Sequence, residues 1–390
     1  MMRVKTLGEL CNIASGGTPS RSQSSYWNDG TIPWIKIGNI KGKYVDNADE
    51  YITQEGLDNS SAKMFSKGTI LYTIFATLGE VGILTIDACT NQAIAGITIK
   101  DHSEVLSDFL FYYLKSKKAY VNKIGRGVAQ NNINMSILRG FKVPLPSISE
   151  QHQIVSVLDA VSNVIGFRQK QLTELDNLIK ARFVEMFGDM LLNEMGWQEV
   201  NLDALADVVS GITKGRKVRE AELIEVPYMA VSNVKDGYID WTTVKTILAT
   251  KQEIEQYRLL PYDVLMTEGG DPDKLGRGAV IVAPLENSIH QNHIFRVRLQ
   301  LEKILPVFFS QYLQNPKAKQ YFLGCAKQTT GIASINMKQL RSLPVLVPPI
   351  ELQEQFAVFV EQVDKSKVVV QKALDEAQTL FDSLMQKYFG

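Results

Sequence analysis

The sequence is built from two copies of one unit, and this duplication constrains the fold more than any other feature. The stretch LGELCNIASG at 7–16 matches LDALADVVSG at 202–211. INMSILR at 133–139 matches INMKQLR at 335–341, and from there the second copy follows the first at a constant distance of 202 residues. Because similar sequences specify similar folds, we expect the 390 residues to form two related domains instead of one large core.

A long helix is predicted at the end of each copy. A proline-containing segment, VPLPS at 143–147 or VLVPPI at 345–350, precedes a long stretch without proline. Apolar residues recur alternately four and three positions apart in each stretch, which is typical of coiled-coil heptads. The predicted seam residues are Ile154, Leu158, Val161, Ile165, Leu172, Leu175 and Ile179 in the first helix and Phe356, Val360, Val363, Val370, Leu374, Phe381 and Leu384 in the second.

Polar residues interrupt the seam at different places in the two helices. Arg168 corresponds to Val370, whereas Lys367 corresponds to Ile165. A polar residue at one seam position fixes register and partner choice, so we predict that the first helix pairs with the second. The alternative is that each helix packs only on its own domain. Helices of about 34 residues would be roughly 50 Å long, which suits a spacer between the domains.

The rest of each copy predicts a mixed α/β or α+β fold. Short apolar runs separated by glycine, aspartate and proline indicate strands, and helices are expected around 105–124 and 303–323. Two globular domains would thus be joined by two long helices, with an internal pseudo-two-fold repeat. The expected divisions are a first globular domain at 1–146, a helix at 147–188, a second globular domain at 196–347 and a helix at 348–390.

The composition is that of a globular protein, with 45% hydrophobic and 22% charged residues. No run of 18 apolar residues occurs and the first twenty residues do not resemble a secretion signal, so we expect a cytoplasmic protein. Cys11, Cys89 and Cys325 are far apart, which argues against a disulfide framework and against a cysteine metal site.

Because the net charge is zero, any positive charge that binds a nucleic acid must be concentrated locally. Basic runs occur at 31–45, 115–126 and 213–219, and each could be either a solvated loop or a contact to phosphates. Base reading needs forked donors and acceptors from Arg, Lys, Asn or Gln on loops. The candidate DNA-binding residues are Lys36, Asn39, Lys41, Lys43, Lys117, Lys118, Arg126, Gln130 and Asn131 in the first copy and Lys214, Arg216, Lys217, Ser232, Asn233, Lys235, Lys327, Gln328 and Thr329 in the second. Asn39 and Asn233 share one repeat position, so they could equally cap a turn.

Catalytic motifs are weak. Val347-Pro348-Pro349-Ile350 lacks the polar residue that a base methyltransferase needs before its prolines, and no Gly-Lys-Ser/Thr phosphate loop occurs. His290 and His293 lack a third nearby ligand, which favours structural histidines over a metal site. Asp271 and Asp273 beside Lys274 are interpreted as a turn instead of a nuclease centre. We therefore expect no catalytic residue and no metal on this chain.

In order, these motifs resemble the specificity subunits of type I restriction-modification systems. The pattern P-L-P-x-x-x-x-Q-x-x-I, from Pro144 to Ile154, opens the first long helix, and a related pattern opens the second. The opening L-G-E-L, the following S-G-G-T-P at 15–19 and the tetrad I-N-M-S are also similar to that family. The second copy departs from the pattern, with G-I-T-K-G at 211–215 and V-P-P-I in place of P-L-P-S, so residue roles transfer less directly there.

The resemblance implies a non-catalytic, sequence-specific DNA-recognition subunit. Each variable domain would be a target-recognition domain for half of a split site on double-stranded DNA. The helices would be antiparallel and would serve as a ruler and as the docking surface for two methyltransferase subunits, which restriction and translocase subunits would join. S-adenosylmethionine, ATP and magnesium would then bind to the partners and not to this chain.

Two other functions compete with this one. A stand-alone DNA methyltransferase or nuclease would need the cofactor and metal motifs that are missing. A coiled-coil protein scaffold without DNA binding is favoured by the zero net charge. Because the loops differ between the copies, the DNA-recognition hypothesis predicts an asymmetric two-part target. Because the chain is neutral, it also predicts weak DNA binding without partners.

Overall fold

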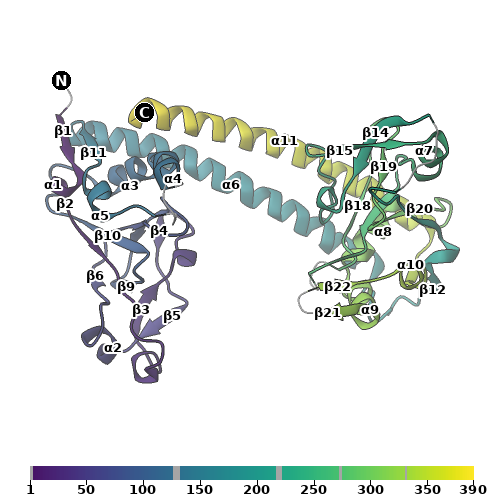
Figure 1. Ribbon diagram of the computed structural model, residues 1–390, viewed down its shortest axis with the longest axis horizontal. Helices are drawn as coiled ribbons and strands as arrows, with labels where there is room; N and C mark the ends of the chain where they lie inside the picture. Colours follow the sequence, from purple (N-terminus) through teal and green to yellow (C-terminus); the bar gives the residue numbers. More distant parts are fainter. Residues whose placement is uncertain (1–2, 126–131, 217–221, 272–274, 330–331) are drawn as a thin grey trace. The chain divides into compact units, whose positions relative to one another are not determined.

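The computed structural model describes residues 3–125, 132–216, 222–271, 275–329 and 332–390 (Figure 1). The chain divides into two compact units. Unit 1 contains residues 1–169 and 372–390, and unit 2 contains residues 170–371. Each unit therefore holds one globular domain with half of each long helix. No helix in the described ranges is long and apolar enough to cross a bilayer.

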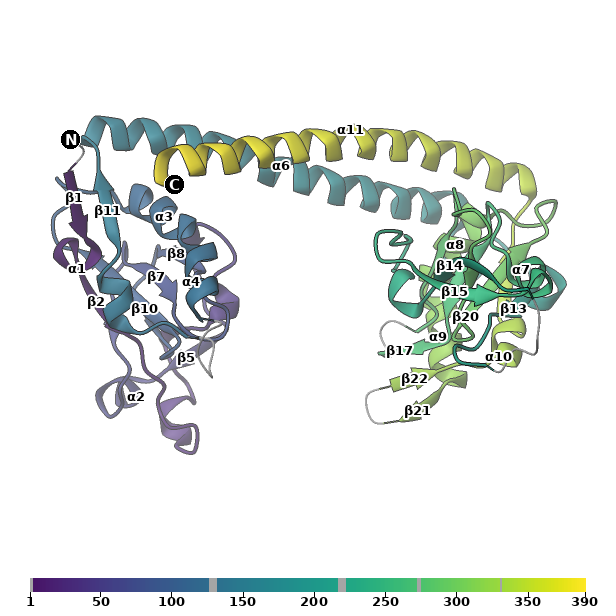
Figure 2. The same cartoon turned by 45° about the horizontal axis from the view of Figure 1, so that its top comes forward.

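Two sheets form the globular part of unit 1 (Figures 1 and 2). The larger sheet has the order β2-β10-β7-β8-β4 and the smaller has β5-β3-β9-β6, while β1 pairs with β11. Among the strand pairs in the described residues of unit 1, only β4–β8 and β3–β9 are parallel. The strands are β1 (Arg3–Thr6), β2 (Cys11–Ser15), β3 (Ile32–Ile35), β4 (Tyr44–Val45), β5 (Glu50–Ile52), β6 (Met64–Phe65), β7 (Ile70–Thr73), β8 (Val81–Leu84), β9 (Ala88–Thr90), β10 (Ile94–Ile99) and β11 (Lys142–Leu145).

Helices of unit 1 cover the larger sheet and connect it to the long helices. The expected helix around 105–124 is two helices, α3 (Ser107–Ser116) and α4 (Lys118–Gly125). The remaining helices are α1 (Leu7–Leu10), α2 (Gln54–Asp58), α5 (Met135–Arg139) and α6 (Ile148–Phe187), with 3-10 turns η1 (Ser24–Tyr26) and η2 (Ile37–Asn39). Six consecutive residues of α3, from Phe109 to Leu114, are buried, since one face meets the sheet and the other meets α6.

Unit 2 repeats this plan. Its largest sheet has the order β13-β20-β16-β18, beside sheets β15-β14-β19 and β17-β22-β21 and the pair β12–β23. The strands are β12 (Gln198–Asn201), β13 (Ala206–Ser210), β14 (Ile224–Met229), β15 (Lys245–Ala249), β16 (Val264–Thr267), β17 (Gly269–Gly270), β18 (Gly278–Val280), β19 (Ile289–His290), β20 (Ile294–Leu299), β21 (Lys327–Thr329), β22 (Ile332–Ser334) and β23 (Pro344–Val347). The helices are η3 (Leu202–Ala204), η4 (Val231–Asn233), α7 (Lys251–Tyr257), α8 (Pro306–Gln314), α9 (Pro316–Cys325), α10 (Met337–Arg341) and α11 (Ile350–Phe389).

The two long helices pair within each unit, and they run in opposite directions. In unit 2 the Phe183 and Phe187 rings lie 5.5 Å from Phe356, and Lys367 Nζ is 2.6 Å from Asp176 Oδ1. Increasing residue numbers on α6 thus meet decreasing numbers on α11. In unit 1 the last turns of α11 join the core that contains the first half of α6. All fourteen predicted seam residues are buried or half-buried.

The first turn of each long helix is anchored by a buried glutamine at the same repeat position. Gln151 Oε1 accepts from Leu106 N at 2.9 Å, and Gln353 Oε1 accepts from Leu305 N at 2.9 Å. Both side chains are fully buried. The glutamine of the P-L-P-x-x-x-x-Q pattern is therefore a joint between helix and domain.

Candidate nucleic-acid interface

In each domain several segments of the chain meet at one turn. These turns are residues 90–93 in unit 1 and residues 290–293 in unit 2, and we call them the hub turns. The first hub turn lies between β9 and β10 and bonds to three distant segments. In unit 1, Gly17 N donates to Thr90 O at 2.9 Å, Asn91 N to Ile35 O at 3.2 Å and Ile74 N to Ala93 O at 2.8 Å.

The second hub turn lies between β19 and β20 and repeats these contacts with different residues. In unit 2, Ile212 N donates to His290 O, Gln291 N to Met229 O and Glu268 N to His293 O, each at 3.0 Å. The backbone framework is thus common to both domains, while the side chains that it presents are different.

Shared glycines allow the close approach at the hub turns. A Cβ atom on Gly16 would lie 2.3 Å from Thr90 O, and one on Gly211 would lie 1.9 Å from His290 O. No side chain fits at such distances, so glycine is required in both copies. This explains why these glycines end the first matching block of the sequence.

The segment that precedes α5 or α10 also joins each hub. Ile133 N donates to Ile74 O at 3.1 Å and Ile335 N donates to Glu268 O at 2.9 Å. In unit 2 the segment continues into the β21–β22 hairpin, which contains Lys327, Gln328 and Thr329 and is joined to β17. The corresponding candidates Arg126, Gln130 and Asn131, like Lys217 in the second copy, lie outside the described residues.

The amide side chains of the hub turns were missed by the sequence analysis, which named only His290 and His293 there, as structural histidines. Gln92 is exposed and its Oε1 accepts from the Thr18 hydroxyl, while Asn91 is half-buried. In unit 2, Asn292 is half-buried and the exposed His293 Nδ1 lies 2.6 Å from Glu268 Oε2. Amides of this kind form paired hydrogen bonds with adenine. In the sequence, the only indication of these amides as candidates was a short polar stretch directly after an apolar run, TNQ at 90–92 and HQNH at 290–293.

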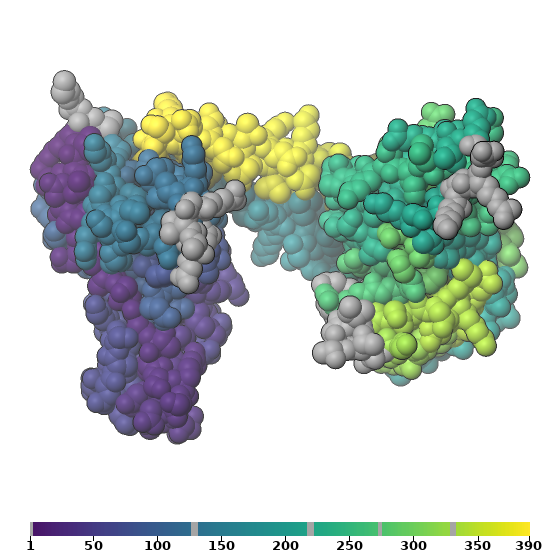
Figure 3. Space-filling model, viewed as in Figure 1, coloured from purple at the N-terminus to yellow at the C-terminus, as the bar shows by residue number. Residues whose placement is uncertain are grey.

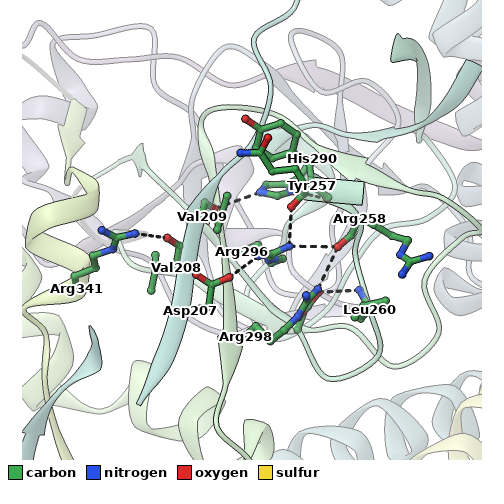
Figure 4. A network of polar contacts seen from close by, with 12 residues as sticks. Asp207, Val208, Val209, Tyr257, Arg258, Leu260, His290, Arg296, Arg298 and Arg341 are labelled. Atoms are coloured by element: carbon green, nitrogen blue, oxygen red, sulfur yellow. Dashed lines mark hydrogen bonds and ion pairs between the residues drawn. The ribbon is translucent and has the colours of Figure 1, made fainter. Parts of the chain in front are cut away.

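A network of polar contacts, built around the buried residues Arg296, Asp263 and His290, supports the second hub turn (Figure 4). Arg296, on β20, is almost fully buried and donates to Asp207 Oδ2 at 2.7 Å and to Gln256 O at 3.1 Å. Arg298 forms two hydrogen bonds, of 2.7 and 2.8 Å, with the buried carboxylate of Asp263. The equivalent region of unit 1 has an apolar strand, IAGITI, so only the second domain uses charged residues here.

His290 belongs to this network and is neutral at physiological pH. Its ring nitrogens lie 3.2 Å from Tyr257 O and 3.3 Å from Val209 O, and no part of the residue is exposed. Burial lowers the pKa of His290 to about 4. In the described part of the chain no three His, Cys, Asp or Glu side chains cluster as metal ligands. Asp273 and Lys274 lie outside it.

Asn39 and Asn233 form the same turn cap in both copies. Asn39 Oδ1 accepts from Lys36 N at 2.8 Å, and Asn233 Oδ1 accepts from Ala230 N at 2.9 Å. Asn233 also donates to Asp240 O and to the Thr243 hydroxyl, each at 3.0 Å. Both asparagines are buried, so the structure gives them the capping role that the sequence left open.

Four of the candidate DNA-binding residues form ion pairs within their own unit, namely Lys36, Lys43, Lys118 and Arg216. Lys43 Nζ lies 2.6 Å from Asp159 and 2.7 Å from Asp108, which fixes the β4 strand to α3 and α6. Burial alone would lower the pKa of Lys43, but its bonds to Asp108 and Asp159 outweigh this effect and raise it. The hydrogen bond from Lys36, followed by that from Arg21, lowers the pKa of Glu50.

Arg216 is the corresponding case in unit 2. Its Nε and Nη2 atoms each lie 2.5 Å from a carboxylate oxygen of Glu253, whose pKa this pairing lowers to about 2. A residue engaged in this way is positioned by the fold and is not free to follow DNA. Lys43 and Arg216 therefore hold segments of their own domains together in this structure.

The other candidates keep some exposure. Lys41, Lys214, Ser232 and Lys327 are exposed and Lys235 is half-buried. Lys118 pairs with Glu80 at 2.6 Å, and Lys117 donates to the carbonyl of Phe389 at 3.2 Å. Lys117 thus contacts the end of the long helix α11 and Lys118 is held by Glu80, whereas Lys41, Lys214 and Ser232 lie on segments next to a hub.

The two tandem domains share one backbone framework and differ in their exposed loops, and the long helices pair. These features define the class of protein, which is a DNA-recognition subunit with repeated target-recognition domains. A family model described as the type I restriction modification DNA specificity domain matches residues 1–177 and, again, residues 194–377. The chain belongs to this family. The resemblance noted from the sequence is confirmed, and so is the duplicated architecture.

Curated relatives match the chain over nearly its full length. The MjaIX specificity subunit of Methanocaldococcus jannaschii is 25% identical, over 98% of this chain and 91% of the relative. The EcoKI specificity subunit of Escherichia coli K12 is 22% identical, over 99% of this chain and 88% of the relative. Both relatives are named specificity subunits of type I restriction enzymes.

Solved structures share the fold. The S subunit of the type I restriction-modification system of M. genitalium superposes with a TM-score of 0.56 and 16% identity, over 100% of this chain and 96% of that one. A chain from a study of the assembly of a type I R-M system gives a TM-score of 0.58 and 18% identity, over 99% of this chain and 97% of that one. At these identities the likeness concerns the fold.

Proposed function

We propose that the chain reads an asymmetric two-part DNA sequence, one half with each hub turn and its neighbouring loops. One observation carries the proposal: the two hubs have the same backbone hydrogen bonds but present different side chains. A common framework places both turns in the same way, and different amide, imidazole and lysine groups then select different bases. A palindromic target would require similar groups in both copies.

Base-specific readout is tested with single amide substitutions in the complex with its methyltransferase partner. Gln92→Ala removes an exposed amide of the first hub, and Asn292→Ala removes a half-buried amide of the second. Each should relax selection at one position in one half-site by about 1–3 kcal/mol, or roughly tenfold to a hundredfold, and leave the other half-site unchanged. The measurement is sequencing of methylated sites from a randomised DNA library. Gln355→Ala, an exposed amide on α11, is the control.

The result can also contradict the proposal. If both variants alter the same half-site, if neither alters base preference, or if the methylated sequence is palindromic, the hubs do not read two different half-sites. A uniform loss of methylation at all sites would place these amides in positioning and not in specificity.

Two methyltransferase subunits are proposed to dock on the outer faces of the long helices. Two pairs of repeat-related apolar residues are exposed on the long helices, Phe167 with Val369 and Leu178 with Leu380. They are 64%, 68%, 47% and 51% exposed, respectively. Unit 1 carries Phe167 and Leu380, and unit 2 carries Val369 and Leu178. Large apolar residues that recur exposed at equivalent positions of two repeats are suited to equivalent protein contacts. Two repeat-related sets of such residues fit two copies of one partner, which would carry S-adenosylmethionine; ATP and magnesium would bind to further restriction subunits.

Stoichiometry tests this arrangement. Phe167→Asp or Val369→Asp alone should reduce the bound methyltransferase from two copies to one, and the double variant should bind none in native mass spectrometry. Asn163→Asp adds the same charge to an exposed polar position and should keep two copies. Two bound copies on the double variant would show that the docking surface lies elsewhere.

A further inference from the structure

A row of three polar side chains, Glu268, His293 and Asn292, lies at the second hub turn. His293 Nδ1 lies 2.6 Å from Glu268 Oε2, and the amide nitrogen Nδ2 of Asn292 lies 3.3 Å from His293 Nε2. The side chains of His293 and Glu268 are 56% and 34% exposed, and Asn292 is half-buried. Both ring nitrogens of His293 are therefore engaged, and the amide of Asn292 is the end of the row.

The carboxylate sets the hydrogen-bonding roles along this row. An ionised carboxylate only accepts, so His293 Nδ1 carries a hydrogen and donates it to Glu268. In a neutral imidazole the other nitrogen, Nε2, is then an acceptor, and the atom of Asn292 that faces it is the donor Nδ2. The orientation of the Asn292 amide is thus set by Glu268 through His293.

The Asn292 amide keeps one acceptor and one donor for a ligand. Its Oδ1 and the second hydrogen of its Nδ2 have no partner among the described residues. An acceptor beside a donor matches the major-groove edge of adenine, where N6 donates and N7 accepts. Guanine presents two acceptors at that edge, and neither pyrimidine presents both groups. An amide held in this orientation therefore favours adenine.

The first hub turn shows that the fold does not need this row. In unit 2, Glu268 N donates to His293 O at 3.0 Å, and the equivalent bond of 2.8 Å in unit 1 joins Ile74 N to Ala93 O. Ile74 thus stands where unit 2 has Glu268. Ala93 stands where unit 2 has His293, and the backbone bond forms without either polar side chain. The carboxylate and the imidazole are therefore free to serve a ligand.

The amide at the equivalent position of unit 1, that of Gln92, is not oriented in this way. Its Oε1 accepts from the Thr18 hydroxyl. A hydroxyl both donates and accepts, so this contact tolerates either orientation of the amide. Of the two amides, only that of Asn292 is held with a defined order of acceptor and donor.

The β21–β22 hairpin places a positive charge near this row. Gly269, the residue after Glu268, pairs with Ser334 on β22. Ser334 pairs in turn with Lys327 on β21, which is exposed. The hairpin lies between α9 and α10 in the chain, and Figure 3 shows these two helices in yellow-green on the surface of unit 2. A lysine here suits a phosphate of the DNA segment that the amide reads.

We propose that Glu268 and His293 are positioning residues that make Asn292 select an adenine in the half-site of unit 2. This inference rests on the proposed function, since it requires that the second hub turn faces DNA. Asn292 Oδ1 accepts from N6 of the adenine, and Asn292 Nδ2 donates to N7. Glu268 and His293 do not touch the base; they hold the amide so that no other base satisfies both of its groups.

The test uses the complex with the methyltransferase partner, a randomised duplex DNA library and sequencing of methylated sites. Asn292→Ala identifies the base pair that the amide reads, and the unmodified chain should show adenine on one strand there. Asn292→Asp should move the preference towards cytosine, because a carboxylate only accepts and cytosine N4 donates. A duplex with 7-deazaadenine at this position lacks the N7 acceptor. The unmodified chain should direct its methylation about tenfold more slowly, whereas Asn292→Ala should not distinguish it from adenine.

Unit 1 provides a matched variant for the positioning pair. Glu268→Ile together with His293→Ala gives the second hub turn the side chains with which the first hub turn folds. Selection of adenine at the position read by Asn292 should fall about tenfold, and all other positions should keep their preference. Glu302→Gln, which alters an exposed glutamate before α8, is the control and should change no position.

The outcomes separate this inference from the proposed function. If Asn292→Ala alters no base preference, the second hub turn does not read DNA and both fail. If it alters a position that is not adenine, or if the double variant keeps full selection there, the hub turn reads DNA but Glu268 and His293 do not set the base. An equal loss at all positions, in a double variant that circular dichroism shows to be folded, would overturn the inference as well.

Discussion

The glutamine joints at the start of the long helices lead to a quantitative prediction. Gln353 is fully buried, and its Oε1 accepts from Leu305 N at 2.9 Å while its Nε2 donates to Pro348 O at 2.8 Å and to Lys303 O at 3.2 Å. Gln353→Met keeps the volume of the side chain but removes all three hydrogen bonds. At about 1 kcal/mol each, the loss is about 3 kcal/mol in the free energy of local opening.

Hydrogen exchange measures this loss at the amide that is affected. The amide of Leu305 loses its side-chain acceptor, so its exchange should accelerate by roughly a hundredfold, since 1.4 kcal/mol corresponds to a factor of ten. Gln151→Met should have the same effect on Leu106 in unit 1, where the bonds are equivalent. Gln355→Met, on the exposed face of the same helix, is the control.

The outcome separates a joint from a passive core residue. If Gln353→Met leaves the exchange of Leu305 within a few-fold of the unmodified chain, the three hydrogen bonds do not hold the helix to its domain. If Gln355→Met accelerates the same amide equally, the effect comes from the helix as a whole and the reasoning fails.

Three other predictions follow from buried and exposed ionisable side chains. His290 has a folded pKa of about 4 and an unfolded pKa near 6.5, so the unfolded state binds more protons between these values. Its contribution to stability is therefore complete above about pH 6.5 and falls by up to ~1.4 kcal/mol per pH unit towards pH 4. In urea titrations at pH 7 and 5, His290→Thr should make unit 2 less pH-dependent; an unchanged dependence would refute the buried neutral state. Lys41→Met should weaken DNA binding by the assembled complex and reduce its salt slope by about 1. Lys43→Met should instead cost about 2 kcal/mol of stability and leave the slope unchanged, and the reverse pattern would contradict the assignment of its ion pairs.

The long helices could be predicted because their signal is local and periodic. The seam follows from spacing alone, and both α6 and α11 form over the proline-free stretches. The polar seam residue Lys367 pairs with Asp176 on the other helix, which agrees with the prediction that the first long helix pairs with the second. Antiparallel pairing came from the family resemblance, because a heptad pattern reads the same in both directions.

The candidate interface was less predictable, because its contacts join residues that are far apart in sequence. Lys43 stands in a basic loop, and nothing nearby reveals that Asp108 and Asp159 will pair with it. Gln92 and Asn292 escaped notice for the opposite reason, since a short polar turn between strands is common. Their position became meaningful only when backbone hydrogen bonds placed three other segments around them.

Comparison of the two copies explains which residues should carry specificity. Positions that are identical in both copies carry the framework: Gly16 and Gly211 permit the close approach at the hubs, and Asn39 and Asn233 cap one turn. A residue that both domains need cannot distinguish two different half-sites. Discrimination must therefore come from positions where the backbone is the same and the side chain differs, and the hub turns are such positions. Identity between repeats, as at Asn39 and Asn233, is thus an argument for a structural role.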